Sequence, residues 1–253
     1  MRHTALIASA LLAAAGAASA EEAAAPTSPF AKENFSVTAS FATDYLFRGL
    51  SNSDNDPAFQ PAINWGYNGW YAGIWGSNVD DTFDDGADIE IDFYVGYAGD
   101  IGNFHYDLGA TYYTFPGADD TTGEDNYWEL IPKVSYTFES LPLQPVLGFQ
   151  YAYSPEFFGE AGESHDIEIT GSFSLPSEFT LKAIGGHQSY DGTGPGVGDA
   201  WNYSYWSIGV ARTIAGFDFS LAYWDTTDNA EQRLGDDIAG DHVLFTVSRT
   251  FGF

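Results

Sequence analysis

The sequence predicts an all-β fold, a transmembrane antiparallel up-and-down β-barrel of about 12 strands. The first observation is strict alternation of apolar and polar residues, clearest in residues 87–97 (ADIEIDFYVGY). Successive side chains of a strand leave opposite faces, so this stretch has one apolar face and one that begins with three carboxylates. The second observation is a regular alternation of short and long connections between such stretches. The third is that no later apolar run reaches the about 18 residues of a membrane helix.

The N-terminal segment has the pattern of an export signal. Arg2 and His3 precede an apolar run over 5–18, and the small residues of Ala18-Ser19-Ala20 form a cleavage site. This pattern predicts a signal peptide at 1–20, and the run is too short and too rich in alanine for a membrane anchor. Alanine and two prolines at 21–33 indicate a flexible lead-in, so we expect the outer-membrane barrel to occupy 34–253.

Charge and composition narrow the classes of function. The formal net charge is −28, which argues against binding of nucleic acid because that requires a basic surface. A chain this acidic is often disordered, but 17% aromatic residues predict a folded protein. The chain has no cysteine, so an exported fold must be held by strand pairing and burial alone.

The strand pattern begins in the N-terminal half. In the first stretch, Phe35, Val37 and Phe41 oppose Ser36 and Ser40. The second has apolar residues opposite Gln and Asn, the third is ambiguous because both faces carry tryptophan, and the fourth is the stretch quoted above. The fifth and sixth set aromatic and aliphatic residues against His, Asp, Glu and Lys. The six stretches are 35–49, 57–66, 69–79, 87–97, 102–115 and 127–138.

The C-terminal half repeats the pattern six times. The seventh to ninth stretches oppose aromatic and aliphatic residues to Gln, Asp, Glu and Lys, and the tenth is again ambiguous. The eleventh and twelfth alternate phenylalanine and valine with Asp, Ser and Thr. These stretches are 143–154, 164–175, 178–190, 201–213, 217–225 and 241–253. Because two of the twelve stretches are weakly patterned, ten or fourteen strands remain open.

The connections favour a membrane barrel over a soluble β-sandwich. Short turns lie at 66–69, 98–102, 139–142, 175–178 and 214–216, and long loops lie at 50–57, 80–87, 116–126, 155–164, 190–200 and 226–241. The long loops hold more than half of the 36 acidic residues and would all lie at one end. Short periplasmic turns with long, here acidic, extracellular loops are typical of outer-membrane barrels. A soluble β-sandwich does not require the short turns and the long loops to lie at opposite ends.

One part of the chain resembles a known family. The run TDYLFRGLSNSDNDPAFQPAINWGYNGWYAGIWGSNVD, followed by DIEIDFYVGYAGD, is similar to the TorF-type porin family of proteobacteria. The similarity covers Thr43 to about Asp100 and rests on D-Y-x-F-R-G-x-S, P-A-x-Q and G-x-Y-x-G-x-W-x-S-N-V. The resemblance implies an outer-membrane barrel with channel activity. It implies no catalytic residues and no established substrate.

The predicted lumen face is acidic. Rings of charged side chains set the selectivity of pores, so this face predicts a cation-preferring channel for passive diffusion of small hydrophilic solutes. The alternative is that the charges pair across strands and plug a narrow barrel, which then serves in adhesion or surface structure. The predicted pore-lining residues are Asp44, Arg48, Asp88, Glu90, Asp92, Asp107, Glu129, Lys133, Asp166, Glu168, Lys182 and Asp218, with Arg212 as a further candidate.

Two other kinds of site are weaker. The acidic loops offer oxygen ligands for Ca²⁺ or Mg²⁺, but none has the spacing of a known calcium loop, so a solvated surface bridged by cations to lipopolysaccharide is favoured. His187 and Ser189 in GGHQSYDG resemble the base and nucleophile of outer-membrane lipid hydrolases. Tyr190 stands where the lipases have asparagine, and we can name no third residue. We therefore expect no enzyme activity, no cofactor and no metal site.

The predicted location is the bacterial outer membrane, with the barrel integral to it after cleavage of the signal peptide. The expected partners are outer-membrane lipid, lipopolysaccharide and small hydrophilic solutes. The last strand ends on Phe253. A terminal aromatic resembles the signal that bacterial barrel-assembly machinery reads. Arg249 falls on the lipid face near the periplasmic rim, where a long side chain can reach the headgroups.

Overall fold

The structure is a computed structural model that describes residues 28–80, 86–118, 125–191 and 202–253. The predicted signal peptide at 1–20 and most of the predicted lead-in at 21–33 lie outside the described residues. So do many of the acidic loop residues, at 81–85, 119–124 and 192–201.

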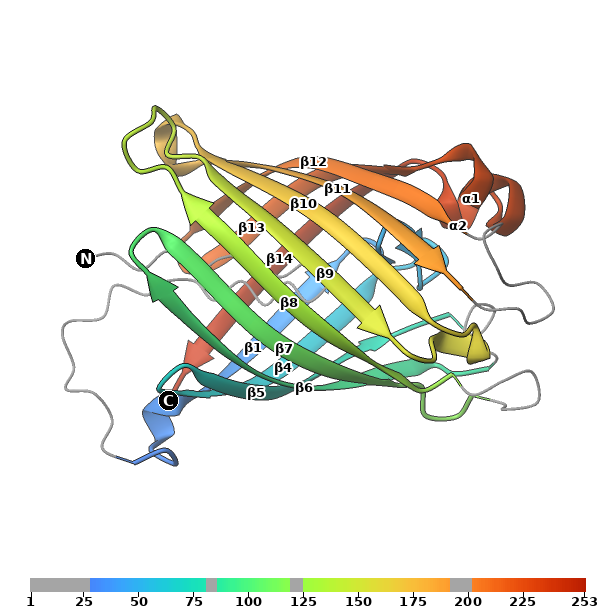
Figure 1. Ribbon diagram of the computed structural model, residues 1–253, viewed down its shortest axis with the longest axis horizontal. Coiled ribbons are helices and arrows are strands. Elements are labelled where there is room, and N and C mark those ends of the chain that lie inside the picture. The colour runs from blue at the N-terminus through green and yellow to red at the C-terminus, as the bar shows by residue number, and fades with distance from the viewer. Residues whose placement is uncertain (1–27, 81–85, 119–124, 192–201) are drawn as a thin grey trace.

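The described chain forms a closed antiparallel barrel of twelve strands (Figure 1). Each strand pairs with its neighbour in the chain, which confirms the predicted up-and-down barrel. The barrel strands are β1 (Phe35–Ala42), β4 (Ala58–Tyr67), β5 (Trp70–Asn78), β6 (Ile89–Ile101), β7 (Phe104–Thr114), β8 (Tyr127–Thr137), β9 (Val146–Ser154), β10 (Ser164–Ser174), β11 (Thr180–Tyr190), β12 (Tyr203–Ile214), β13 (Phe217–Thr226) and β14 (His242–Gly252).

The first and last strands close the ring. Ser36 of β1 lies opposite Gly252 of β14 on one side, and Phe35 lies opposite Trp65 of β4 on the other. The start of β1 and the C-terminus lie at the end of the barrel that carries the short turns (Figure 1). The opposite end carries the long connections.

Burial runs opposite to that of a soluble protein. In β6, Phe93 and Val95 point outward and are 47% and 51% exposed, whereas Glu90 and Asp92 point inward and are 2% and 1% exposed. The same alternation shows which side chains point inward in the two stretches that were ambiguous in the sequence. In β5, Trp75 is buried inside and Ile74 is exposed outside. The barrel therefore has an apolar outer face and a polar interior.

The predicted first strand, 35–49, is wrong beyond Ala42. The chain leaves the wall there and forms a small hairpin of β2 (Leu46–Phe47) and β3 (Leu50–Ser51). Arg48 and Gly49 make the bend with φ of 51° and 84°, a left-handed conformation that a continuing strand does not adopt. We call residues 43–57 the lumen hairpin. Of the predicted outer loop at 50–57, residues 50–53 are therefore buried inside the barrel, and residues 54–57 are exposed.

Helices occupy the last long connection. They are α1 (Asp228–Leu234) and α2 (Asp236–Ala239), and three 3-10 helices lie at η1 (Lys32–Asn34), η2 (Phe158–Glu160) and η3 (Pro176–Glu178). Both α-helices lie at the end of the barrel opposite the C-terminus (Figure 1). Among the described residues, no helix is both long and apolar enough to span a membrane.

Candidate functional site

The lumen hairpin packs against opposite sides of the barrel wall. Its Tyr45 lies 5.3 Å from the ring of Trp75 on β5, within a buried cluster that also includes residues of β4, β7 and β8. On the other side, Leu46 and Leu50 belong to a cluster with Tyr205 of β12 and residues of α1 and α2. The hairpin is thus held from two sides and covered by the two helices.

Asp44 organises the base of the hairpin. One of its carboxylate oxygens, Oδ1, accepts hydrogen bonds from the hydroxyls of Ser51 at 2.7 Å and Ser53 at 2.9 Å. The other oxygen lies 3.3 Å from Nδ1 of His242 on β14. His242 also lies 3.0 Å from the side-chain oxygen of Asn55. These contacts tie both ends of the hairpin to the wall.

Arg48 stands at the tip and reaches three strands of the wall. Its Nη1 and Nη2 donate to the two oxygens of Glu129 on β8, each at 2.9 Å. Nη1 also donates to Oε1 of Gln188 on β11 at 2.8 Å, and Nε lies 3.5 Å from Asp166 on β10. All four side chains are buried. A two-point contact of a planar guanidinium with a carboxylate fixes both position and orientation.

Tyrosines hold the carboxylates that receive Arg48. The hydroxyl of Tyr113 donates to Glu129 at 3.1 Å. The hydroxyl of Tyr205 donates to Asp166 at 2.9 Å and to Glu168 at 3.2 Å. The Tyr205 ring lies over Gly186, where an added Cβ would be 2.1 Å from a ring atom. Only glycine permits that approach, so this backbone position sets the place of the tyrosine.

A second acidic pair lies on the inner face of β6. Glu90 and Asp92 are both buried and interact with each other, and Glu90 accepts a hydrogen bond from Tyr45 of the hairpin. The two side chains share a hydrogen bond, and no other donor among the described residues reaches the carboxylate oxygens of Asp92. Two buried carboxyl groups in contact repel each other when both are ionised, so a cation beside this pair would be stabilised.

The lumen toward the short turns is less tightly filled. Asp107 on β7 accepts a hydrogen bond from Tyr71 at 2.7 Å and lies opposite Lys133 of β8 in the strand register. Lys182 on β11 interacts with Asp218 on β13. These four charged side chains are half-buried, so here charges of both signs line the inner face.

The structure thus gathers most of the predicted pore-lining residues inside the barrel, with two differences. Asp88 precedes β6 and is exposed, so it lies outside the lumen wall. Asp44 and Arg48 lie inside, but on the hairpin instead of on β1. The further candidate Arg212 points outward, where it pairs with Glu178 at 3.6 Å and stacks on Phe179.

Sequence reasoning missed the uncharged members of the site. Gln188 and Tyr205 are fully buried inside, and Tyr113 is buried beside Glu129. Alternation within 178–190 would have placed Gln188 on the same face as Lys182, which was the available signal. No signal in the sequence linked these residues to Arg48, because the hairpin fold brings them together.

The proposed hydrolase pair does not assemble. Both residues lie near the outer end of β11, but Nδ1 of His187 lies 2.9 Å from the hydroxyl of Ser204. The hydroxyl of Ser189 donates to the backbone carbonyl of His165 at 3.2 Å. The hydrogen bonds of the described residues therefore do not make His187 the base for Ser189.

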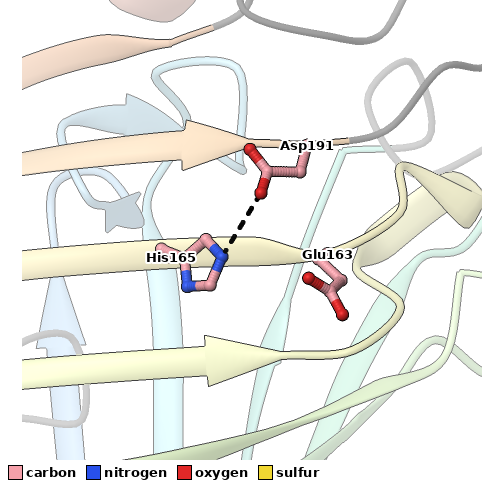
Figure 2. A group of neighbouring side chains, drawn as sticks. All are labelled: Glu163, His165 and Asp191. Atoms are coloured by element: carbon pink, nitrogen blue, oxygen red, sulfur yellow. Dashed lines mark ion pairs between the residues drawn. The ribbon is translucent and has the colours of Figure 1, made fainter.

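A group of potential metal ligands lies on the same outer rim (Figure 2). Glu163, His165 and Asp191 place one ligand atom each within 4.8 Å of one another, and His165 pairs with Asp191 at 3.7 Å. Tyr151 is hydrogen-bonded to His165 at 2.7 Å, and Tyr153 donates to Glu163 at 3.1 Å. Glu163 and Asp191 are exposed, so the group belongs to the outer surface and not to the lumen.

Comparison with known proteins places the chain in a family. The family described as "Bacterial protein of unknown function (Gcw_chp)" matches residues 23–251. The chain belongs to this family. No curated protein matches the sequence of this Gcw_chp member.

Solved structures share the fold of the Gcw_chp barrel. A KdgM porin in complex with disordered oligogalacturonate has a TM-score of 0.56 and 8% identity, covering 86% of this chain and 99% of that one. A NanC porin has a TM-score of 0.52 and 12% identity, covering 87% and 99%. The Gcw_chp barrel therefore resembles outer-membrane channels in fold along nearly its whole described length.

Proposed function

We propose that this Gcw_chp protein is an outer-membrane channel for passive diffusion of small hydrophilic solutes, with a preference for cations. The observation that carries the proposal is the reversal of burial, with apolar side chains outside and carboxylates inside a closed barrel. An apolar outer face suits lipid, and an acidic interior attracts cations. Resemblance to the TorF-type porins over Thr43 to about Asp100 supports the same function.

We propose further that the lumen hairpin closes this channel in the conformation described. It crosses the interior from the end of β1 to the opposite wall and buries the carboxylates it touches. Conduction then requires the hairpin to leave the wall. The outer-membrane setting also gives the chain its proposed partners, namely lipid, lipopolysaccharide, and the assembly machinery that would read the strand ending at Phe253.

The solutes of this channel differ in charge from the compound bound by the KdgM porin. Oligogalacturonate is a chain of carboxylated sugars, and the KdgM structure contains it. The Gcw_chp lumen carries Glu90, Asp92 and Glu168 in addition to the carboxylates that Arg48 neutralises. Entry of a polyanion would meet repulsion from these groups, so we propose neutral or cationic solutes instead.

The test is conductance of the refolded mature protein in a planar bilayer under a KCl gradient. We expect stepwise openings and a reversal potential that indicates K⁺ over Cl⁻. Asp107→Lys and Asp218→Lys should shift this potential toward Cl⁻, whereas Asp88→Lys, outside the lumen wall, should shift it less. Full insertion without conductance, both in the wild type and in Arg48→Ala, would rule out the channel.

A further inference from the structure

We propose that Glu129, Asp166 and Gln188 form a binding site for the guanidinium group of a permeating solute, and that Arg48 occupies this site in the closed barrel. The inference rests on the proposed channel function and names its preferred solute. The opening of the hairpin would exchange an internal guanidinium for an external one.

The site is built by the wall and not by the hairpin. Its three acceptors stand on β8, β10 and β11, three strands joined through β9 in the ring. Glu129 receives two guanidinium nitrogens at 2.9 Å, and Gln188 receives one of them at 2.8 Å. Tyr113 and Tyr205 hold the two carboxylates from behind. When the hairpin leaves, this arrangement remains in the wall.

The shape of the site favours a guanidinium over an ammonium. Glu129 contacts two nitrogens of one planar group, while Gln188 and Asp166 meet the edges of the same group. An ammonium is a compact point charge and cannot span the two oxygens of Glu129 as a planar fork does. Removal of Arg48 leaves two buried carboxylates without their cation, which is unfavourable in free energy. The vacated site should therefore bind another cation.

The neighbouring carboxylates restrict the charge of the solute further. Glu168 shares Tyr205 with Asp166, and the Glu90–Asp92 pair lies elsewhere in the same interior. A carboxylate on the solute would be repelled by these groups. The chemistry therefore fits a small guanidino compound that lacks a carboxylate and carries a net positive charge, for example a guanidino amine such as agmatine.

The first arm of the test measures binding in detergent. Arg48→Ala leaves the acceptors in place. We expect this variant to bind methylguanidinium at least about tenfold more tightly than methylammonium. Binding is measured as the rise in the thermal unfolding temperature of the variant with each cation. The double variant Arg48→Ala/Glu129→Gln should lose this preference. The matched control Arg48→Ala/Glu163→Gln, altered on the outer rim, should keep it. Equal binding of the two cations, or an unchanged preference after Glu129→Gln, would overturn the proposal.

The second arm uses the wild-type chain, so the test does not depend on the folding of Arg48→Ala. In a planar bilayer, agmatine should raise the open probability of the wild type, because it competes with Arg48, and the diamine putrescine should do so less. No difference between the two solutes would contradict the site. Selective binding in detergent without any conductance would instead refute the channel and leave the site standing.

Discussion

Arg48 and Glu129 lie 81 residues apart in the chain and meet inside the barrel, toward the end with the long connections, as a two-point ion pair. Arg48 belongs to the hairpin that follows β1, and Glu129 belongs to β8 on the far side of the ring. The pair therefore connects two walls that share no backbone hydrogen bond. We expect the strength of this ion pair to determine how firmly the lumen hairpin is held across the interior.

Glu129→Gln should release the hairpin. The amide keeps one acceptor for Arg48 but removes the charge, and breaking a buried ion pair costs about 3–5 kcal/mol. We expect a lower urea midpoint in detergent and longer open times in bilayers. Glu163→Gln serves as control because it changes an exposed glutamate. Unchanged gating in Glu129→Gln would show that the ion pair does not hold the hairpin.

Gly186→Ala should disturb the site without touching a charge. The new methyl group would lie 2.1 Å from the Tyr205 ring, so the ring must move away from Asp166 and Glu168. Overpacking of this kind costs about 1–3 kcal/mol. The neighbouring Gly185→Ala has no atom within 4 Å of its added carbon and should be close to neutral. Equal unfolding midpoints for the two variants would contradict this account.

Asp44→Ala should loosen the base of the hairpin. It removes the acceptor of the Ser51 and Ser53 hydroxyls, and hydrogen bonds to a charged group contribute about 1.5–3 kcal/mol each. The measurement is limited proteolysis of the folded barrel, with faster cleavage expected within 43–57. Asp56→Ala, at an exposed hairpin residue without a left-handed backbone, should leave the cleavage rate unchanged. If both variants are cut at the same rate, Asp44 does not anchor the hairpin.

Asp92→Asn should stabilise the barrel. Asp92 is buried against Glu90, and no other donor among the described residues reaches its carboxylate. An amide that can donate to Glu90 removes the like-charge repulsion of the pair and should gain about 1–2 kcal/mol. The expected result is a higher urea midpoint in detergent. Asp107→Asn should lower the urea midpoint, because the Asp107 carboxylate accepts a hydrogen bond from Tyr71 and faces Lys133. A drop in stability for Asp92→Asn would indicate an attractive partner for its carboxylate.

The wall of the barrel could be predicted from the sequence because its rule is local. Alternation of apolar and polar residues assigns each side chain to a face, and turn length assigns each connection to an end. Even the ambiguous stretches 69–79 and 201–213 became strands β5 and β12, since their neighbours on both sides required a partner. The two porin structures that share this fold agree with the predicted barrel.

The interior could be predicted only in part. Alternation placed Glu129 and Asp166 inside, but it also extended the first strand through Arg48, where the chain in fact turns inward. The turn depends on contacts with distant strands, such as that of Tyr45 with Trp75 and that of Arg48 with Glu129. No local pattern reports contacts between segments so far apart.

The seating of the lumen hairpin depends on strands from nearly the whole length of the chain. Its partners lie on β5, β8, β10, β11 and β12, and α2 and β14 contact its base. A growing barrel that still lacks its last strands cannot offer all of these contacts. The lumen hairpin, which follows the first strand in the chain, can therefore dock fully only after the last strands have closed the barrel. Its docking thus distinguishes a complete barrel from an incomplete one.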